Sequence, residues 1–488
     1  MENNKILIRI VFVILLIFIS FCCVPKGMQN DTFYMIKLGD YIVHHGIDLK
    51  DHWSWIAGLT YTYPHWLYDI FIYYVYKLGG YDGIYISTVI CHILLMFVFY
   101  IINVKSNKNE ILTMIFTLFI CVIVSPSATA RASSISNIIF LLEIYYIFRL
   151  IDSGKKRYII ILSLLSLVLA NIHGTSWIFY FILFLPFIGE EIVYCFKKKF
   201  KFKSGTKLII DKINNFKYLM IAFASSLAMG IFTPSRICYS YVFRIMMGNS
   251  QKFIAEHAHL IVIEIPPFII LCFMFIAILS FSKAKIKLSE LFMITGLFIM
   301  SLEAFRHTIL FYLIGGTFIV LVAIRYFSEK KNKTYEKIVN KLNTNWYIWV
   351  AIAVIVGLVN QSNKDEGYIN KKIYPVDAVN YIKENLDYKN INLFNTYNNG
   401  SYIMFNDIPV LIDSRCDLYL NEFNKGIEVF NDVLDIKVST YKKVFKKYKI
   451  EYILMDNDSI FYELLIRDTG EKIYSDEFFS IFKLNPEE

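Results

Sequence analysis

The sequence predicts an α-helical membrane bundle of about eleven spanning helices, followed by a small C-terminal α/β domain. Three observations predict this fold class. The 488 residues are 56% hydrophobic and 17% aromatic, long runs of the chain are almost free of charge, and the basic residues are confined to a subset of the loops between those runs. Backbone polar groups in hydrocarbon have to be satisfied within their own segment, so we expect these runs to be helices.

Eleven apolar runs have a length near that needed to cross a bilayer. In chain order they are 6–24, 83–104, 111–126, 134–150, 158–171, 176–196, 218–233, 263–282, 290–304, 308–327 and 346–361. The first run also has the charged start and apolar core of a signal peptide, but Cys22-Cys23-Val24-Pro25 is a poor small-residue cleavage site. We therefore expect the first run to be a retained helix.

The lysines and arginines predict the orientation of the chain. They gather in the loops at 105–108, 149–157, 197–217, 283–287 and 330–341, and Lys5 and Arg9 accompany the first run. The positive-inside rule places all of these in the cytoplasm, and an odd number of spans then places the C-terminal tail outside. The net charge of +9 is thus an orientation signal, and without a basic face interleaved with aromatics we expect no nucleic-acid partner.

This layout divides the chain into four segments: a first transmembrane helix at 1–24, a long first outer loop with interfacial helices at 25–82, a multi-spanning body at 83–361 and an extracytoplasmic α/β domain at 362–488. In the outer loop, the Asn-Asp pair at 30–31 and Gly46 predict a helix over 31–45. The loop's tryptophans and tyrosines are suited to the headgroup level of a membrane.

The tail alternates short apolar strands with helices. We expect strands at 391–395, 409–413, 451–455 and 479–484 and helices at 421–434 and 437–448. A domain of this size is too small for a complete nucleotide-sugar transferase fold. The chain also has no Walker loop and no GxGxxG fingerprint.

Charged and histidine side chains collect where the apolar runs meet the predicted outer face. They are Asp31, His65, Asp69, Arg131, His173, Glu303, Arg306 and His307. A carboxylate can take a proton from an acceptor hydroxyl, and arginine forks suit a phosphate. Each residue also has an ordinary structural interpretation: Asp31 as the cap of its helix, Asp69 on a helix surface, the arginines as interfacial anchors, and Glu303 as the (i, i+3) ion partner of Arg306.

The sequence contains no strong metal motif. His44-His45 and His257-x-His259 lack the carboxylate partner and spacing of a binding site. We therefore assign no metal ligands and no certain cofactor, and leave a divalent cation open.

Several short motifs carry a resemblance that spans nearly the whole chain. They are Asp31 through Gly39 and Gly46 to Ser54, His65-Trp66-Leu67, Arg131, Asn171-Ile172-His173-Gly174, Glu303-Ala304-Phe305-Arg306-His307, Asn399-Gly400-Ser401-Tyr402 and Ile412-Asp413-Ser414-Arg415 with Asp417-Leu418-Tyr419. This pattern resembles bacterial membrane glycosyltransferases of the GT-C superfamily, which depend on polyprenyl-phosphate sugars, as the protein-mannosyltransferase-like members do.

The resemblance implies transfer of a sugar from a polyprenyl-phosphate donor to a lipid, glycan or protein acceptor on the outer face of the cell membrane. It places Asp31 as general base, with Asp69 and Glu303 as further carboxylates. His65, Arg131, His173, Arg306 and His307 are then expected to bind substrate. Asn30-Asp31 stands where the superfamily often pairs two acids, which leaves metal dependence open.

Two other classes of function remain as alternatives. A transporter or flippase of lipid-linked glycans also needs a cationic site for a lipid phosphate, but it is expected to have interrupted helices and polar residues near the bilayer midplane. The second alternative is a non-catalytic envelope protein whose outer domain binds glycan. The concentration of polar residues at one face favours the transferase.

Overall fold

The computed structural model has helices at every long apolar run of the sequence. It describes residues 2–107, 109–200, 208–248, 250–281, 285–329, 333–364, 367–468 and 470–484. Parts of the lysine-rich segments at 197–217, 283–287 and 330–341 lie outside these ranges.

Six helices in the described ranges are long and apolar enough to cross a membrane: Lys5–Cys23, Trp66–Lys105, Glu110–Ser127, Ser133–Ser153, Gly174–Lys198 and Phe305–Arg325. The pair Glu336–Thr344 and Trp346–Ser362, bent by 69°, makes a seventh if it forms one span. Arg157–Ile172, Phe216–Phe232 and Pro266–Ser280 are shorter apolar helices. The protein is thus a largely helical, multi-pass membrane protein, but its helix lengths do not confirm the expected eleven spans.

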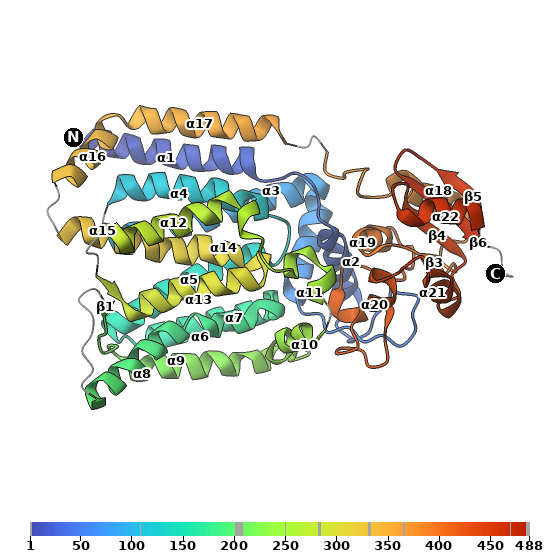
Figure 1. Ribbon diagram of the computed structural model, residues 1–488, viewed down its shortest axis with the longest axis horizontal. Helices are drawn as coiled ribbons and strands as arrows, with labels where there is room; N and C mark the ends of the chain where they lie inside the picture. The colour runs from blue at the N-terminus through green and yellow to red at the C-terminus, as the bar shows by residue number, and fades with distance from the viewer. Residues whose placement is uncertain are drawn as a thin grey trace. The chain divides into compact units, whose positions relative to one another are not determined.

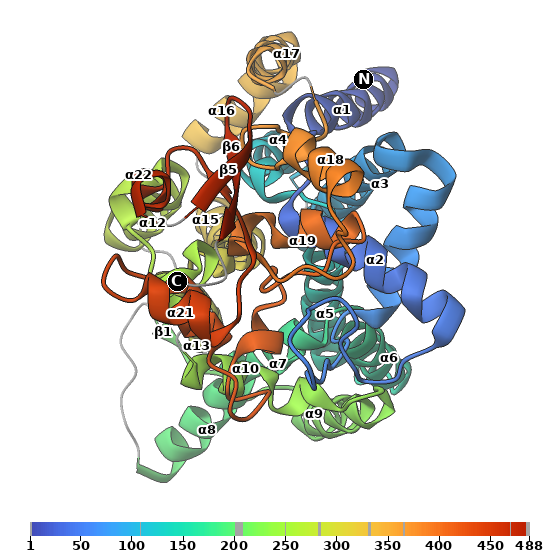
Figure 2. The same ribbon diagram turned by 90° about the vertical axis from the view of Figure 1, so that its right-hand side faces the viewer.

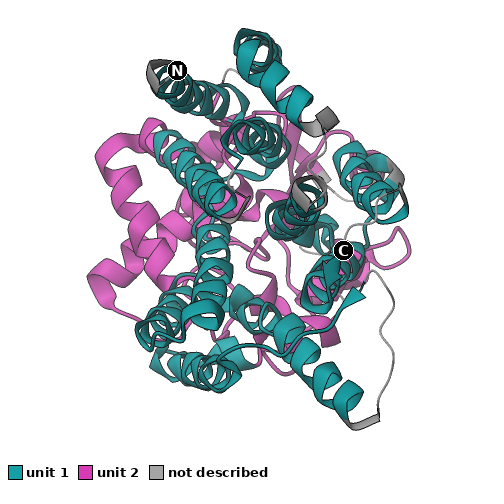
Figure 3. Cartoon of the chain, turned by 90° about the vertical axis from the view of Figure 1, so that its left-hand side faces the viewer, with its two compact units in different colours: residues 1–25, 85–239, 254–364 teal, residues 26–84, 240–253, 365–488 magenta. Residues whose placement is uncertain are grey.

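The chain divides into two compact units (Figure 3). Unit 1 comprises residues 1–25, 85–239 and 254–364, and unit 2 comprises 26–84, 240–253 and 365–488. The long helix α3 (Trp66–Asn107) contributes to both, and Gly80 within it has a non-helical backbone with φ 57°. Unit 2 therefore combines the first outer loop with the tail, a grouping that no local pattern in the sequence indicates.

Unit 1 consists of helices joined by short turns. Its α-helices other than α3 are α1 (Glu2–Cys23), α4 (Glu110–Val124), α5 (Ser133–Ser153), α6 (Arg157–Ile172), α7 (Trp177–Ile182), α8 (Leu185–Phe200), α9 (Phe216–Ala228), α12 (Pro266–Phe281), α13 (Leu288–Glu303), α14 (Thr308–Leu310), α15 (Gly316–Glu329), α16 (Lys333–Thr344) and α17 (Trp346–Ser362). Its 3₁₀ turns are η1 (Ser125–Ser127), η2 (Gly174–Ser176), η3 (Met229–Phe232), η4 (Ile237–Tyr239), η5 (Ala255–His257), η6 (Val262–Glu264) and η7 (Phe305–His307), and η8 (Phe311–Gly315) is a π-helical segment. Strands β1 (Leu208–Ile209) and β2 (Ile286–Lys287) form a short parallel pair.

Small residues bring neighbouring helices of unit 1 close together. Helix α1 lies beside α17 (Figure 1), where a Cβ on Gly357 would come within 2.6 Å of the Phe18 ring. Helices α6 and α9 meet through a 2.8 Å hydrogen bond between Ser163 and Ser225. Small and hydroxyl-bearing residues at such contacts are typical of helices that pack in a membrane.

Unit 2 contains helices and one mixed sheet. Its helices are α2 (Asn30–His45), the start of α3, α10 (Tyr241–Met247), α11 (Ser250–Phe253), α18 (Val376–Asn385), α19 (Tyr397–Phe405), α20 (Val429–Leu434), α21 (Tyr441–Lys447), α22 (Ile460–Asp468) and the 3₁₀ turn η9 (Cys416–Tyr419). The four strands β3 (Leu393–Phe394), β4 (Tyr452–Asp456), β5 (Gly470–Ser475) and β6 (Phe479–Leu484) have the order β3-β4-β6-β5. The first pair is parallel, and the other two are antiparallel.

The sequence prediction for the tail was partly wrong. Residues 409–413 form no strand, although 410–413 are buried, since Val410 makes only an isolated bridge to Ser54 and the Leu411 N–H donates to the Asn395 side chain. The apolar run is satisfied by the first outer loop and by a side chain, not by a neighbouring strand. The helix expected over 421–434 is confined to its end, α20, while the helix expected over 437–448 is present as α21.

Helix α2 confirms the segment predicted at 31–45, and it is held tightly within unit 2. It lies beside α19 (Figure 2), and its Phe33 ring contacts the rings of Tyr374, Tyr402 and Phe405. On α2, Gly39 approaches the main chain of α3 so closely that a Cβ would lie 2.0 Å from the carbonyl oxygen of Asp69. Only glycine fits at this contact.

Candidate functional site

Two arginines predicted to bind substrate lie in one cluster of unit 1, where each contacts the same short turn. Arg131 Nη1 donates to Glu256 Oε1 across 2.6 Å. Arg306 Nη1 lies 2.7 Å from His257 Nε2. Glu256 and His257 are consecutive residues of η5, whereas Arg131 precedes α5 and Arg306 lies in η7 between α13 and α14. The fold thus brings together three segments that are distant in the sequence.

Main-chain hydrogen bonds hold η5 beside η7. The Phe305 N–H donates to the Ala258 carbonyl at 3.1 Å, and the Leu260 N–H donates to the Leu302 carbonyl at 3.0 Å. The segment after η5 is thereby attached to the end of α13. This attachment positions the Glu256–His257 turn over both arginines.

The electrostatics of this arginine cluster keep Glu256 ionised and His257 neutral. Burial alone would raise the pKa of Glu256, but the charge and hydrogen bond of Arg131 lower it, so Glu256 is ionised. Burial, followed by the charges of Arg306 and Arg131, lowers the pKa of His257 to about 3. With His257 neutral, the turn offers Arg131 an anionic acceptor and Arg306 a neutral one.

The same contact fixes the tautomer of His257. Arginine has no acceptor, so Nε2 must accept the hydrogen bond from Arg306, and the ring proton is on Nδ1. In the described part of the chain, His257 Nδ1 is buried without a hydrogen-bond partner.

His307 and His173 support the surrounding helices. His307 Nδ1 lies 3.1 Å from the Met300 carbonyl, which can only accept, and its ring meets Phe179 edge to face at 4.7 Å. His173 follows α6, and its ring nitrogens lie 2.6 Å from Ser136 Oγ and 3.1 Å from Ser176 Oγ. Through these serines His173 links α5, α6 and η2.

Glu303 ends α13 and is largely exposed, with 66% of its side chain accessible. One of its carboxylate oxygens is 3.9 Å from His259 Nδ1. This is a solvated contact, and surface pairs of this kind contribute little stability.

Three predicted site residues lie in unit 2: Asp31, His65 and Asp69. Asp31 is at the start of α2. The cap position belongs to Gln29, so Asp31 is the second residue of the helix and not its cap. A carboxylate in the first turn is favoured by the helix dipole. Its charge also reaches two phenols, because, after burial, Asp31 helps to raise the pKa of Tyr374 and Tyr397.

Asp69 and His65 are both buried. Asp69 is fully enclosed in the first turn of α3, and among the described residues neither of its carboxylate oxygens has a hydrogen-bond partner. His65 precedes α3, and its carbonyl accepts from the Asp69 N–H at 2.9 Å. An acceptor substrate cannot reach Asp69 in this arrangement.

Unit 2 contains a buried ionic network whose members nothing in the sequence marks as partners. Arg415 donates to both carboxylate oxygens of Asp413, at 2.9 and 2.6 Å, and to Asp51 Oδ1 at 2.6 Å. Tyr419 adds a 2.8 Å hydrogen bond to Asp413, and the guanidinium lies over the ring of Tyr61. Burial opposes the charge of Arg415, but Asp413 and Asp51 raise its pKa well above the usual value. The Asp413-Ser414-Arg415 motif was visible in the sequence, but nothing local marked Asp51 as its partner.

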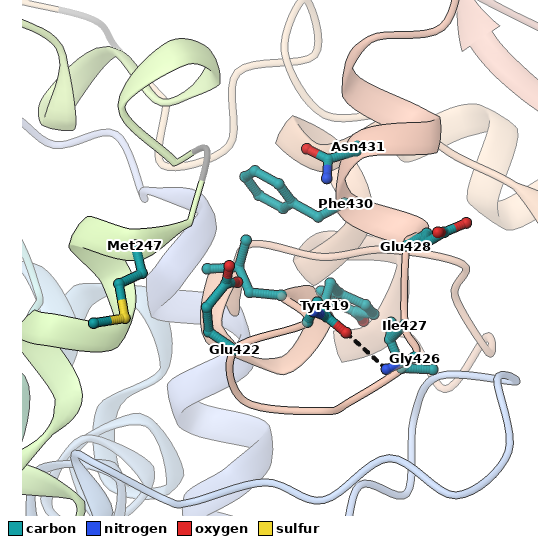
Figure 4. A pocket seen from close by; sticks show the side chains of 10 residues that line it. Met247, Tyr419, Glu422, Gly426, Ile427, Glu428, Phe430 and Asn431 are labelled. Atoms are coloured by element: carbon teal, nitrogen blue, oxygen red, sulfur yellow. Dashed lines mark hydrogen bonds between the residues drawn. The ribbon is translucent and has the colours of Figure 1, made fainter.

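A polar cavity of about 260 Å³ opens in unit 2 near η9 and α20 (Figure 4). Glu422, Glu428 and Asn431 supply polar groups, while Tyr419 and Phe430 supply aromatic surface. The Gly426 N–H donates to the Asn421 side chain at 2.7 Å and shapes the loop that borders the cavity. A cavity of this size and lining can hold a small polar group.

The described residues do not fit a metal centre. No group of three or more histidine, cysteine, aspartate or glutamate side chains gathers among them in a way that could hold an ion. Nε2 of His257 is used by Arg306, which removes the most suitable ligand from the His257-x-His259 motif.

The helices of membrane-spanning length place the chain among multi-pass membrane proteins, and the arginine cluster is its candidate site. No family model and no curated protein matches the sequence. Solved structures do match. The oligosaccharyltransferase of Archaeoglobus fulgidus tethered with an acceptor peptide has a TM-score of 0.60 and 11% identity, over 99% of this chain and 74% of that one.

Two further structures show the same likeness. The archaeal oligosaccharyltransferase AglB from A. fulgidus, in complex with an inhibitory peptide and a dolichol-phosphate, has a TM-score of 0.58 and 10% identity, with 99% and 74% of the chains covered. ArnT from Cupriavidus metallidurans, bound to undecaprenyl phosphate, has a TM-score of 0.56 and 10% identity, with 97% of each chain covered. At these identities the likeness establishes that the chain shares the fold of these structures.

Proposed function

We propose that this protein is a membrane glycosyltransferase that moves a sugar from a polyprenyl-phosphate donor to a lipid, glycan or protein acceptor on the outer face. The observation that carries the proposal is the arginine cluster, in which Arg131 and Arg306 contact consecutive residues of the same turn. The GT-C fold supports it, because solved structures with that fold hold dolichol-phosphate and undecaprenyl phosphate. The bilayer supplies the environment of the donor's lipid chain.

Arg131 and Arg306 are assigned to the donor phosphate. Two guanidinium groups can each present a planar pair of donors to phosphate oxygens, and partial burial strengthens such charge-assisted bonds. His307 lies beside Arg306, where it contacts the Met300 carbonyl and the Phe179 ring, and we assign it to positioning the lipid-linked sugar. His173 and His65 are assigned to substrate binding. Each acts indirectly, by supporting the end of a helix.

Asp31 is assigned as the general base. In the reaction, the bond from the sugar C1 to the donor phosphate oxygen breaks, a bond from C1 to the acceptor oxygen forms, and the base takes the acceptor proton. Asp31 is only partly buried, whereas Asp69 is enclosed and Glu303 is a solvated partner of His259. Asp69 and Glu303 therefore rank below Asp31.

The finer topology belongs to the same proposal. The distribution of lysine and arginine is accounted for by eleven crossings, a cytoplasmic N-terminus and an extracytoplasmic tail that includes the β3–β6 sheet. The six long helices and the bent pair supply seven of these crossings, and the helix at 290–304 and the three shorter apolar helices supply the other four. Shorter segments are tolerated where the bilayer thins locally.

The test measures donor binding and transfer with purified protein and an undecaprenyl-phosphate-linked sugar. Arg131→Lys and Arg306→Lys are each expected to weaken donor binding by about tenfold or more, because an ammonium cannot reproduce the guanidinium fork. Arg157→Lys, at the exposed start of α6, is the matched control. Donor binding that is unchanged in both cluster variants would return these arginines to an anchoring role.

Two observations favour a second function. A flippase of lipid-linked glycans is expected to have polar groups within its spans, and Glu143 in α5 and His92 in α3 are both buried there. The π-helical segment η8 is a helix interruption of the kind such proteins use. Translocation of a fluorescent lipid-linked sugar in proteoliposomes, without sugar transfer, would favour this function.

A further inference from the structure

The Glu256–His257 turn gives the two arginines acceptors that resemble those of a phosphate. Glu256 offers a carboxylate oxygen to Arg131 at 2.6 Å, and His257 offers an unprotonated ring nitrogen to Arg306 at 2.7 Å. A phosphate likewise offers oxygens in more than one direction. One anionic and one neutral acceptor thus occupy the positions from which the arginines would hold a phosphate.

A partly buried guanidinium needs such a partner, because an uncompensated charge at this depth is costly. Side-chain exposures of 26% for Arg131 and 41% for Glu256 place the pair at the edge of the protein, where an incoming ligand can reach it. The pair therefore satisfies Arg131 without sealing it.

The turn can leave without unfolding a helix. Its main-chain attachments lie after it, from Ala258 to η7 and from Leu260 to the end of α13, and within η5 the bonds are local, from His257 and Ala258 back to Ile254. A 3₁₀ turn of three residues has little structure to lose. Displacement of Glu256 and His257 requires only a local change before Ala258.

We propose that the Glu256–His257 turn acts as an internal substitute for the lipid phosphate, leaving the arginines when the donor binds and returning to expel the polyprenyl phosphate product. This inference rests on the proposed function of the arginine cluster. The product needs such help, because loss of the sugar converts a phosphodiester with one negative charge into a monoester with a second ionisable oxygen. Two arginines would otherwise hold the product more tightly than the donor.

Removal of the negative charge of Glu256 should tighten the binding of the lipid phosphate. In Glu256→Gln, undecaprenyl phosphate in detergent is expected to bind about tenfold more tightly, since hydrogen bonds to charged groups contribute more than neutral ones. In turnover assays the same variant should show stronger inhibition by undecaprenyl phosphate and a lower kcat. Glu264→Gln, an equal charge change on the exposed η6 of the same loop, is the matched control and should bind as the wild type does.

The outcomes separate the two proposals. If Arg131→Lys and Arg306→Lys both bind undecaprenyl phosphate as the wild type does, the cluster is not a phosphate site and both proposals fail. If either arginine variant weakens binding but Glu256→Gln binds equally or less tightly, the arginine assignment stands and the substitute role of the turn is overturned. A Glu256→Gln protein that elutes as a single species but binds no lipid also counts against the turn.

Discussion

Arg415 donates a 2.6 Å hydrogen bond to Asp51, a residue 364 positions earlier in the chain, and both side chains are almost fully enclosed. The same guanidinium holds Asp413, so one buried cation compensates two buried carboxylates. The contact attaches the first outer loop to the tail within unit 2. It places the segment before His65 and α3 at a fixed point of that unit.

Arg415→Ala is expected to destabilise the protein by ~3–5 kcal/mol, because it leaves Asp51 and Asp413 buried without a partner. Lys447→Ala is the matched control: Lys447 also contacts two carboxylates, those of Glu428 and Asp432, but its side chain is 46% exposed. The control should lose at most ~1 kcal/mol. Chemical denaturation in detergent measures the free energy of unfolding of both variants. Equal losses would show that the buried Arg415 network contributes no more stability than the exposed contacts of Lys447.

Asp417 predicts a pH dependence of stability. Burial raises its pKa to about 7, against the opposing charge of Arg415. In the unfolded chain an aspartate ionises near pH ~4, so between about pH 4 and 7 the folded state binds more protons and its stability falls as pH rises. Asp417→Asn should remove this decline. Melting temperatures of both proteins at pH 5 and pH 8 provide the measurement, and the variant's gain should be larger at pH 8. An equal effect at the two pH values would contradict a raised pKa.

Asp31→Asn is expected to lower the rate of sugar transfer by ~10²–10⁴-fold while donor binding and melting temperature stay near the wild type, since the amide cannot take a proton. Asp40→Asn on the same helix is the control, because the Asp40 carboxylate is 46% exposed and contacts His44 at the surface, at 3.2 Å. Near-normal turnover by Asp31→Asn would direct attention to Glu303.

Cysteine labelling tests the orientation of the chain in intact cells. In a background without native cysteines, Asp458→Cys is expected to react with a membrane-impermeant reagent, whereas Lys155→Cys should react only after permeabilisation. Both positions are exposed in the structure. Reaction of Lys155→Cys in intact cells, or protection of Asp458→Cys, would reverse or break the proposed topology.

The comparison of sequence and structure separates local signals from long-range ones. The helix at 31–45 was predictable because the Asn-Asp pair and Gly46 mark its ends, and it is observed at Asn30–His45. Arg131 and Arg306 could be nominated as anion ligands from their positions at the ends of apolar runs. Residues 409–413 were misread because burial and apolar character do not reveal whether backbone groups pair with a strand or with a distant loop.

The partners of the charged residues were beyond the sequence. Glu256 pairs with Arg131 across 125 positions, and no periodicity or spacing connects them. The enclosure of Asp69 was equally hidden, since it lies where Gly39 of α2 closely approaches the main chain of α3. Pairings of this kind are decided by tertiary packing, which a single sequence does not display.

The distance along the chain between Asp51 and Arg415 also sets an order of events during synthesis. At typical translation rates of about 5–20 residues per second, the 364 intervening residues take roughly 20 to 70 seconds to emerge. Throughout that interval the first outer loop carries a carboxylate whose partner does not yet exist. Asp51, in the loop between α2 and α3, therefore has to wait for the tail before its buried charge is neutralised. A nascent chain truncated before Arg415 would leave this loop open to proteases and chaperones.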